Sequence, residues 1–354
     1  MAEQLKLLLS GPGLIGHKHA QLIKDLSDAE LVAVVAPESS ENIEFARQYN
    51  VKLYVDINKA LDREHVDGVI ISSPNEYHYA QALSCIERHI PVLVEKPITE
   101  NIKQSLQLYK RAKQLNVPVL VGHHRTYNPL LETVKTFMES DKFGELVTFS
   151  GSVLFYKPNQ YFIDGPWRTK KGGGPILINL IHEIGLVRYL CGEIKEVFAI
   201  ASNRIRGYEV EDTAAITLVF KNGALGNFIL SDTAASNQSW ELTTGENPDY
   251  PKHDDANCYH FAGTNGSIDF PTMSARYYPL GSERSWWSSF KYEKLQRIEG
   301  PSLKLQMLHF LDVIKNGRDP RVSAMDGHMN LVVVSAILKS IETKTIVNVD
   351  EDAL

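Results

Sequence analysis

Lys96 ends a short apolar run, Val92-Leu93-Val94, and stands between Glu95 and Pro97. A run of this length with β-branched residues is typical of a buried parallel strand. Ligands bind at the carboxyl ends of such strands in an open α/β sheet, and a proline favours an extended conformation for the residue before it. We therefore predict that Glu95 and Lys96 lie at a ligand-binding edge, where an ammonium group stabilises negative charge. The alternative for Lys96 is a solvated lysine in a loop.

A second stretch able to do chemistry is Gly172-Gly173-Gly174-Pro175 with the apolar segment after it. Proline suits a first helical turn, and the glycines let the backbone approach a ligand closely. Asn179 and His182 follow, three residues apart and so on one face of the expected helix. The side chain of Asn179 can orient a hydroxyl but cannot ionise. A histidine in an apolar helix is more often a packed core residue, so the pattern alone leaves His182 open.

The first expected strand, Leu5 to Ser10, runs into a glycine-rich turn that opens a helix. In the pattern GxGxxG, the first glycine allows the turn, the second admits a pyrophosphate and the third lets helix and strand pack closely. The position after the first strand makes this motif specific for dinucleotide binding. The residues predicted to hold the pyrophosphate are Gly11, Gly13, Leu14, Ile15 and Gly16.

These residues need a sheet to position them, and apolar runs separated by helical stretches supply one. Parallel neighbours require helical crossovers, so six such runs predict a doubly wound parallel sheet, an α/β Rossmann domain over residues 1–122. The predicted strands are Leu5 to Ser10, Leu31 to Ala36, Lys52 to Val55, Val66 to Ser73, Val92 to Glu95 and Val117 to Gly122.

A second domain is expected over residues 123–354, because a chain of 354 residues is too long for one ordinary core. Its strand-like stretches alternate in polarity, and Asn222-Gly223 predicts a hairpin turn. These stretches are Leu146 to Tyr156, Val197 to Arg204, Thr213 to Phe220, Ala224 to Ala234 and Trp240 to Thr244.

The cofactor choice depends on the end of the second strand. An acid there would hold a ribose 2′-hydroxyl; the usual position carries Ala36, and Glu38 lies two residues on. The alternative is that Ser39 and Ser40 face the 2′-phosphate of NADP. No Lys or Arg occurs between residues 31 and 46 to pair with that phosphate, so NAD is preferred over NADP. After the fourth strand, a loop is expected to cover the nicotinamide ribose, with Asn75 as the N-cap of the next helix. Its predicted cofactor-binding residues are Ser73, Pro74, Asn75 and His78.

Composition narrows the functional classes. A net charge of -6 without a basic block argues against a nucleic-acid surface. The first residues lack an apolar segment long enough for a signal peptide or a membrane span, so a cytoplasmic protein is expected. Three cysteines without CxxC spacing suggest neither disulfides nor a zinc site, and the His and Asp residues between Tyr250 and His260 fit no metal pattern.

Taken together, the ordered motifs resemble the glucose-fructose oxidoreductase / inositol dehydrogenase (Gfo/Idh/MocA) family. The resemblance covers nearly the whole chain. It implies a Rossmann domain followed by an α+β domain with a large, open, mainly antiparallel sheet, which in this family commonly forms a homodimer or homotetramer. The motifs are the GxGxxG turn, Ser-Pro-Asn with His78, Glu95-Lys96-Pro97, residues 122–125 and 127–129, Trp167-Arg168, the triple glycine with His182, and residues 306–315.

The resemblance assigns roles that spacing alone does not. It implies that His182 handles a proton beside the substrate. We predict that Lys96 is an orienting cation and possible relay, with an exchange of these two roles as the alternative. Asn179, Trp167, Arg168 and Tyr156 are then predicted substrate contacts. Many family members carry an aspartate four residues before this histidine, but this chain has Ile178. This departure leaves the proton chemistry to Lys96 and His182 and suggests a substrate other than the inositols.

The sequence therefore predicts an NAD(P)-dependent dehydrogenase that oxidises a secondary alcohol of a cyclic polyol or sugar. One alternative substrate is a cis-dihydrodiol of a carboxylated arene, which the aromatic content would suit. A second alternative is a redox-inactive regulator that binds a dinucleotide. A small-molecule substrate is expected in the first two cases, and neither nucleic acid nor membrane is an expected partner.

Overall fold

The structure is a computed structural model that describes residues 4–350 of the chain. The chain forms two compact units. The first contains the residues up to Tyr127 together with Leu303–Leu331, and the second contains Asn128–Ser302 together with the residues from Val332 on. The division of function between residues 1–122 and 123–354 stays a prediction.

The first unit is built on a parallel sheet, as expected, and within the described residues this sheet has six strands in the order β3-β2-β1-β4-β5-β6. The order reverses between β1 and β4, which is where ligands bind in such sheets. Each strand overlaps one of the predicted apolar runs. The strands are β1 (Leu5–Ser10), β2 (Ala29–Val35), β3 (Lys52–Tyr54), β4 (Gly68–Ile71), β5 (Val92–Glu95) and β6 (Val119–Gly122).

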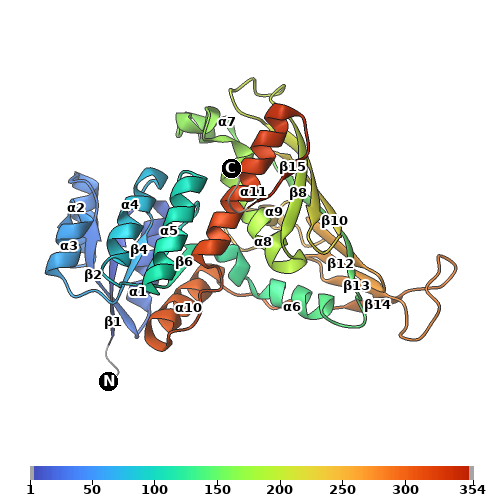
Figure 1. Ribbon diagram of the computed structural model, residues 1–354, viewed down its shortest axis with the longest axis horizontal. Coiled ribbons are helices and arrows are strands. Elements are labelled where there is room, and N and C mark those ends of the chain that lie inside the picture. The colour runs from blue at the N-terminus through green and yellow to red at the C-terminus, as the bar shows by residue number, and fades with distance from the viewer. Residues whose placement is uncertain (1–3, 351–354) are drawn as a thin grey trace. The chain divides into compact units, whose positions relative to one another are not determined.

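Helices connect these strands and lie along the sheet (Figure 1). β1, β4 and β5 have helices on both faces, which is why their sequences are continuous apolar runs rather than alternating ones. The helices of this unit are α1 (Leu14–Asp25), α2 (Ser40–Gln48), α3 (Ile57–Arg63), α4 (Asn75–Ile86), α5 (Ile102–Leu115), the short helix η1 (His124–Tyr127), α10 (Ser302–Asn316) and the start of α11 (Ala324–Thr343).

The late segment joins the first unit through apolar packing. Met307 and Phe310 of α10 are fully buried in the core of the parallel sheet. Gly68 of β4 accommodates this helix, because a Cβ atom there would lie 2.5 Å from Cδ1 of Ile314. The backbone also pairs, since the amide of Val121 donates to the carbonyl of Val322 over 2.9 Å.

The second unit carries a nine-stranded sheet over the part of the chain that the structure describes, in the order β14-β13-β12-β11-β7-β10-β9-β8-β15. Only the β7–β10 pair is parallel in this set, so the sheet is mainly antiparallel, as expected. The strands are β7 (Leu146–Leu154), β8 (Ile194–Ser202), β9 (Thr213–Phe220), β10 (Leu225–Ser231), β11 (Tyr259–Gly263), β12 (Gly266–Phe270), β13 (Ser274–Tyr277), β14 (Lys291–Lys294) and β15 (Val347–Asn348).

Helices cover one side of this sheet, and α8 and the end of α11 lie along it (Figure 1). The predicted Asn222-Gly223 turn is confirmed: it joins β9 to β10, and Gly223 has a φ of +90°. The helices of the second unit are α6 (Pro129–Met138), α7 (Asn159–Ile163), η2 (Pro166–Thr169), the π-helical turn η3 (Ile176–Leu180), α8 (Ile181–Cys191) and α9 (Trp240–Thr243).

The predicted strand Trp240 to Thr244 is wrong, because this segment forms α9. The alternation of apolar and polar residues in this segment is typical of a strand, but Ser239 begins a helix here. The Ser239 side chain accepts a hydrogen bond from the amide of Leu242, and the Thr243 hydroxyl donates to the Ser239 carbonyl over 2.7 Å. A serine at this position satisfies the free amides of a first helical turn. The turn places Trp240 inside the core, where it stacks on Phe270 at a centroid distance of 5.4 Å.

No helix within residues 4–350 is long and apolar enough to cross a membrane.

Phe149 of β7 lies at the centre of the aromatic core of the second unit. Its ring is fully buried and lies 5.0 Å from Phe228 and 5.1 Å from Phe261, measured between centroids. Phe149→Ala leaves a cavity, so we expect the free energy of unfolding to fall by about 3–5 kcal/mol in urea titrations followed by fluorescence. Val147→Ala on the same strand is the control, because Val147 is 50% exposed. Equal losses in the two variants would contradict this packing.

Candidate functional site

The glycine-rich turn after β1 is shaped by two close approaches of backbone. Gly11 has a φ of +86°, and a Cβ atom on it would lie 2.4 Å from the Ser73 nitrogen. A Cβ atom on Gly16 would lie 2.1 Å from the carbonyl oxygen of Gly11. Around Gly13, by contrast, a Cβ atom would meet no atom within 4 Å. The turn is therefore packed at its first and third glycines and open at the second.

The open glycine is the N-cap of α1. The first hydrogen bond inside this helix runs from the His17 amide to the Gly13 carbonyl over 2.8 Å. The amides of Leu14, Ile15 and Gly16 precede it and have no partner within the helix, and the positive end of the helix dipole lies there. A pyrophosphate fits this arrangement, because it needs amide donors and room beside Gly13.

The end of β4 supports the same turn. The Ser72 hydroxyl donates to the Gly11 carbonyl over 2.7 Å, and the Ser73 hydroxyl donates to Oε1 of Gln81 over 2.8 Å. The prediction that Asn75 is the N-cap of α4 is wrong: Pro74 occupies that position, and Asn75 is the first helical residue. The extended backbone of Pro74, with ψ at 147°, already opens the helix, so no side-chain cap is used.

His78 connects the β4 loop to the segment after Lys96. Its Nδ1 lies 2.8 Å from the Pro97 carbonyl oxygen and its Nε2 lies 2.8 Å from the Ser73 carbonyl oxygen. The ring is buried. Both ring nitrogens therefore hold backbone within the first unit, and a direct contact of His78 with the cofactor stays a prediction.

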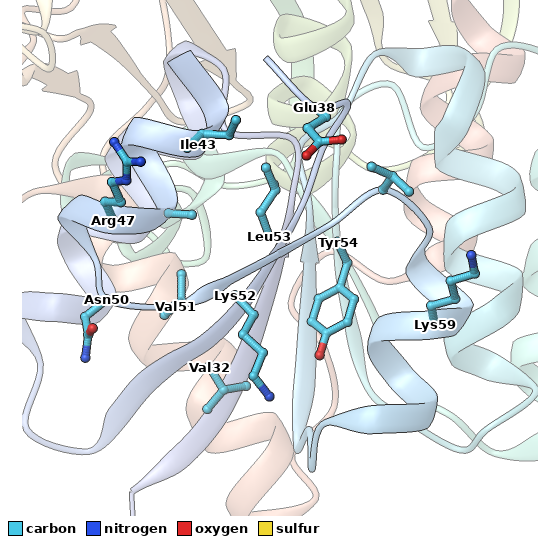
Figure 2. A pocket seen from close by; sticks show the side chains of 12 residues that line it. Val32, Glu38, Ile43, Arg47, Asn50, Val51, Lys52, Leu53, Tyr54 and Lys59 are labelled. Atoms are coloured by element: carbon cyan, nitrogen blue, oxygen red, sulfur yellow. The ribbon is translucent and has the colours of Figure 1, made fainter. Parts of the chain in front are cut away.

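A pocket of about 730 Å³ opens along β3 beside the end of β2 (Figure 2). Exposed Glu38 lines it, as do Arg47 of α2 and Lys59 of α3. The sequence prediction considered cations only up to residue 46, and so it missed both of these basic side chains. The pocket thus has one acidic side chain, Glu38, and three basic ones, Arg47, Lys52 and Lys59, at its wall.

Lys96 follows β5, two strands away from β1 at the same edge of the sheet. Burial lowers the pKa of Lys96; the charge of Glu95 opposes this shift and the charge of Arg125 adds to it. A lysine with a lowered pKa can exchange a proton nearer to neutral pH than a solvated one. Lys96 is therefore not a fully solvated loop lysine, and its catalytic role stays a prediction.

The carboxylate of Glu95 is hydrogen-bonded to a histidine that the sequence prediction missed. Nε2 of fully buried His19 in α1 lies 2.8 Å from Oε1 of Glu95. Burial alone would raise the pKa of Glu95, but the hydrogen bond and charge of His19, with the charges of His124 and Lys96, lower it. A carboxylate therefore lies next to Lys96 and favours its charged form.

Two glycines of the triple glycine in the second unit pack closely against other residues of this unit. A Cβ atom on Gly173 would lie 2.7 Å from the Trp167 carbonyl oxygen, and one on Gly174 would lie 2.7 Å from Oε1 of Glu211. The same Glu211 oxygen accepts a hydrogen bond from the Ile176 amide over 2.9 Å. The close approach that the sequence predicted for a ligand is thus made by protein groups at these two glycines.

Asn179 lies in the π-helical turn η3, and buried His182 lies in the first turn of α8. Such π turns frequently occur at functional sites. The sequence prediction placed both side chains on one regular α-helix and missed this turn.

A buried lysine, Lys157, belongs to the same region and was also missed. Its Nζ donates to Oδ1 of Asn179 over 2.7 Å and lies 3.7 Å from Oδ2 of Asp232. Nε of Arg206 binds the other oxygen of Asp232 over 2.8 Å. One signal could have found Lys157: it follows a strand-like run and precedes Pro158, as Lys96 precedes Pro97.

The three remaining predicted substrate residues take part in contacts between arginines and aromatic rings: Arg206 lies over Tyr156, and Arg168 lies over Trp167. Tyr156 and Trp167 are 59% and 55% exposed, and so they present aromatic surface. Arg168 donates to the Tyr161 carbonyl and stacks on the Tyr161 ring, 3.9 Å from its centroid. The guanidinium of Arg168 therefore has a structural partner, and a substrate contact stays a prediction.

The predicted cofactor residues all lie in the first unit, and the predicted substrate residues all lie in the second. Among residues 4–350, no group of three or more His, Cys, Asp or Glu side chains is arranged to hold a metal ion. His260, from the stretch considered as a metal cluster, lies 2.6 Å from Asp269 across neighbouring strands.

Comparison with known proteins matches both units to one family. Residues 5–123 match the oxidoreductase family with an NAD-binding Rossmann fold, and residues 131–269 match the GFO/IDH/MocA C-terminal domain.

Curated relatives of similar length exist. The chain is 25% identical to myo-inositol 2-dehydrogenase of Thermotoga maritima, over 98% of this chain and 99% of that protein. It is 26% identical to scyllo-inositol 2-dehydrogenase (NAD(+)) of Bacillus subtilis, over 99% and 98% of the two chains.

Among solved structures, an oxidoreductase from Agrobacterium radiobacter in complex with NAD+, L-tartaric acid and magnesium has a TM-score of 0.81 over 98% of both chains. At 17% identity this likeness shows the fold alone. The two family matches, together with the two-unit fold, lead to one conclusion: the chain belongs to the GFO/IDH/MocA family and is an NAD(P)-dependent dehydrogenase that acts on a CH–OH group.

Proposed function

We propose that this enzyme oxidises a secondary alcohol of a cyclic polyol or sugar and that it uses NAD. One observation carries this proposal: a single edge of the parallel sheet holds both the open turn at Gly13 and the partly buried Lys96, whose charged form the neighbouring Glu95 favours. Binding a dinucleotide requires the first feature, and stabilising an alkoxide requires the second. The named relatives support the substrate class, since both are inositol dehydrogenases.

Glu38 is the basis for preferring NAD over NADP. Its exposed carboxylate at the end of β2 suits a ribose 2′-hydroxyl and would repel a 2′-phosphate. Arg47 and Lys59 line the same pocket and are the residues through which NADP would bind instead.

The proton chemistry is assigned to two side chains. Bound NAD supplies the hydride acceptor. In this proposal, His182 accepts the hydroxyl proton of the substrate, because an imidazole exchanges protons near neutral pH. The ammonium of Lys96 stabilises the oxygen that becomes negative. Because burial lowers the pKa of Lys96, this lysine is also able to relay the proton.

The substrate contacts are assigned to the second unit. Asn179 orients a hydroxyl, and exposed Tyr156 and Trp167 offer flat surfaces on which a ring packs. Ile178 stands where many relatives carry an aspartate, so the substrate differs in its polar groups from the inositols.

We propose a cytoplasmic homodimer or homotetramer that assembles through the sheet of the second unit. One face of β7, β9 and β10 is exposed along its length in the isolated chain, and it includes apolar side chains such as Leu225 (54% exposed) and Ile229 (38%). Covering such a face by a second copy removes apolar surface from water.

Gly13→Val tests the dinucleotide site. The added side chain extends into the open space beside the turn, so we expect NAD affinity to fall at least about tenfold, or ~1.4 kcal/mol. Isothermal titration calorimetry measures the affinity, and the melting temperature without ligand should stay unchanged. Gly16→Ala is the matched variant, and it should lower the melting temperature because its Cβ would meet the Gly11 carbonyl. Unaltered NAD binding in Gly13→Val would refute this site.

Glu38→Gln tests the cofactor choice. The wild type should bind NAD more tightly than NADP, and the variant should narrow this difference about tenfold because the repelling charge is gone. Fluorescence titration with NADH and NADPH measures both affinities. Glu139→Gln, the same change at an exposed residue after α6 in the second unit, should leave the ratio unaltered. A wild type that favours NADPH would overturn the assignment of Glu38.

Lys96→Met tests the chemical step. A panel of cyclic polyols, sugars, sugar acids and arene cis-dihydrodiols is first assayed for NADH formation by the wild type. On the best substrate, we expect kcat of the variant to fall by about 10³-fold or more, a loss of ~4 kcal/mol in transition-state stabilisation. The rise in melting temperature caused by NAD should persist. Lost NAD binding would contradict the role of Lys96, and no turnover of any compound would contradict the proposed function.

A further inference from the structure

The ammonium of Lys157 determines which way the side-chain amide of Asn179 faces. Its Nζ lies 2.7 Å from the Asn179 side chain. A lysine ammonium carries three donors and no lone pair, so only the amide oxygen can face it. The amide nitrogen is consequently turned away, and among the described residues it makes no hydrogen bond. The oxygen and nitrogen of an asparagine amide are hard to tell apart by shape, but here the hydrogen-bond donor on Lys157 determines which atom faces it.

Lys157 is itself held firmly. Its side chain is 8% exposed, and its ammonium lies 3.7 Å from Oδ2 of Asp232, whose side chain is 2% exposed. Arg206 occupies the other carboxylate oxygen and also donates to the Lys157 carbonyl over 2.8 Å. The ring of Tyr161 covers the ammonium at 4.8 Å from its centroid. A lysine held on these sides has little freedom to release Asn179.

We propose that Lys157 is a positioning residue that presents the side-chain nitrogen of Asn179 to the substrate, so that the enzyme selects a substrate with an acceptor oxygen at this point. The inference rests on the proposed function, because it places the substrate beside Asn179 and His182. A hydroxyl, carbonyl or carboxylate oxygen satisfies the amide donor. An ammonium or a methylene at the same position leaves the donor without a partner and is rejected.

The pair also confers a pH dependence. Burial lowers the pKa of Lys157 to about 8; the charges of Asp232 and Glu241 oppose this shift, and those of Arg206 and Arg168 add to it. Below this pKa the ammonium fixes the amide. Above it, the neutral amine gains a lone pair and can accept as well as donate, so the amide is free to turn. KM for the substrate should therefore rise as the pH passes about 8.

The first experiment observes the pair without substrate. In ¹⁵N-labelled, deuterated protein, the side-chain amide signal of Asn179 is assigned by its absence in Asn179→Ala. We expect it to shift with a midpoint near pH 8 in the wild type and to stay constant in Lys157→Arg, because a guanidinium keeps its charge and its donors. An amide signal that does not move in the wild type, or that moves equally in Lys157→Arg, overturns the proposal.

The second experiment is a double-mutant cycle on the best substrate of the wild type. Lys157→Met and Asn179→Ala should each raise KM about tenfold with less than a threefold change in kcat. Adding Lys157→Met to Asn179→Ala should change KM less than twofold, since the amide that Lys157 orients is gone. Lys157→Arg should retain the wild-type KM and lose its rise above pH 8. A residue with a merely structural role would lower the melting temperature without this coupling.

The two experiments separate this inference from the function on which it rests. If turnover is present but the KM effects of the two substitutions multiply, the inference is overturned and the proposed function stands. If the amide signal titrates as expected but no polyol or sugar is oxidised, the proposed function fails and the Lys157–Asn179 pair remains.

Discussion

The backbone of Gly11 passes so close to Ser73 that a Cβ atom would lie 2.4 Å from the Ser73 nitrogen. This contact joins the carboxyl ends of β1 and β4, the two strands between which the strand order reverses. Packing of α1 against the turn follows from it, because Gly16 must pass under the Gly11 carbonyl, and the free amides of the helix then face the open space at Gly13. A side chain at Gly11 or Gly16 would separate helix, turn and strand, and the ligand-binding edge would be lost.

The same edge brings several charged and ionisable side chains together. His19 lies one helical turn beyond Gly16 and reaches Glu95, which follows β5's apolar core residues and adjoins Lys96. A histidine, a carboxylate and an ammonium thus follow one another from the dinucleotide turn to the predicted catalytic lysine. Burial would drive Lys96 toward its neutral form, and the anionic Glu95 limits that shift. The helix that follows the glycine-rich turn therefore also supports the carboxylate that favours the charged form of the lysine.

The second unit uses a comparable arrangement. Asp232 holds Lys157 and Arg206 in a buried ionic cluster, and Lys157 reaches Asn179 in the π turn. Buried charges are retained only where partners offset the desolvation cost. The partners here are Asp232, which follows β10, and Arg206, which lies in the loop after β8. Both are distant in sequence from η3. The antiparallel sheet thus contributes more than a scaffold, since it holds the lysine that orients the side chain of Asn179.

The sequence by itself determined the features that follow from local pattern. The order of apolar runs fixed the parallel sheet, the glycine spacing fixed the turn before α1, and Lys96-Pro97 marked the end of β5. Only the tertiary structure decided the rest. Trp240 looked like part of a strand until the Ser239 cap and the core contact with Phe270 made the segment helical. The contacts of His19, Lys157 and Asp232 have no local signature, because the partners lie 76, 22 and 26 residues away along the chain. Local periodicity specifies secondary structure, whereas hydrogen bonds between buried polar groups depend on which segments the fold brings together.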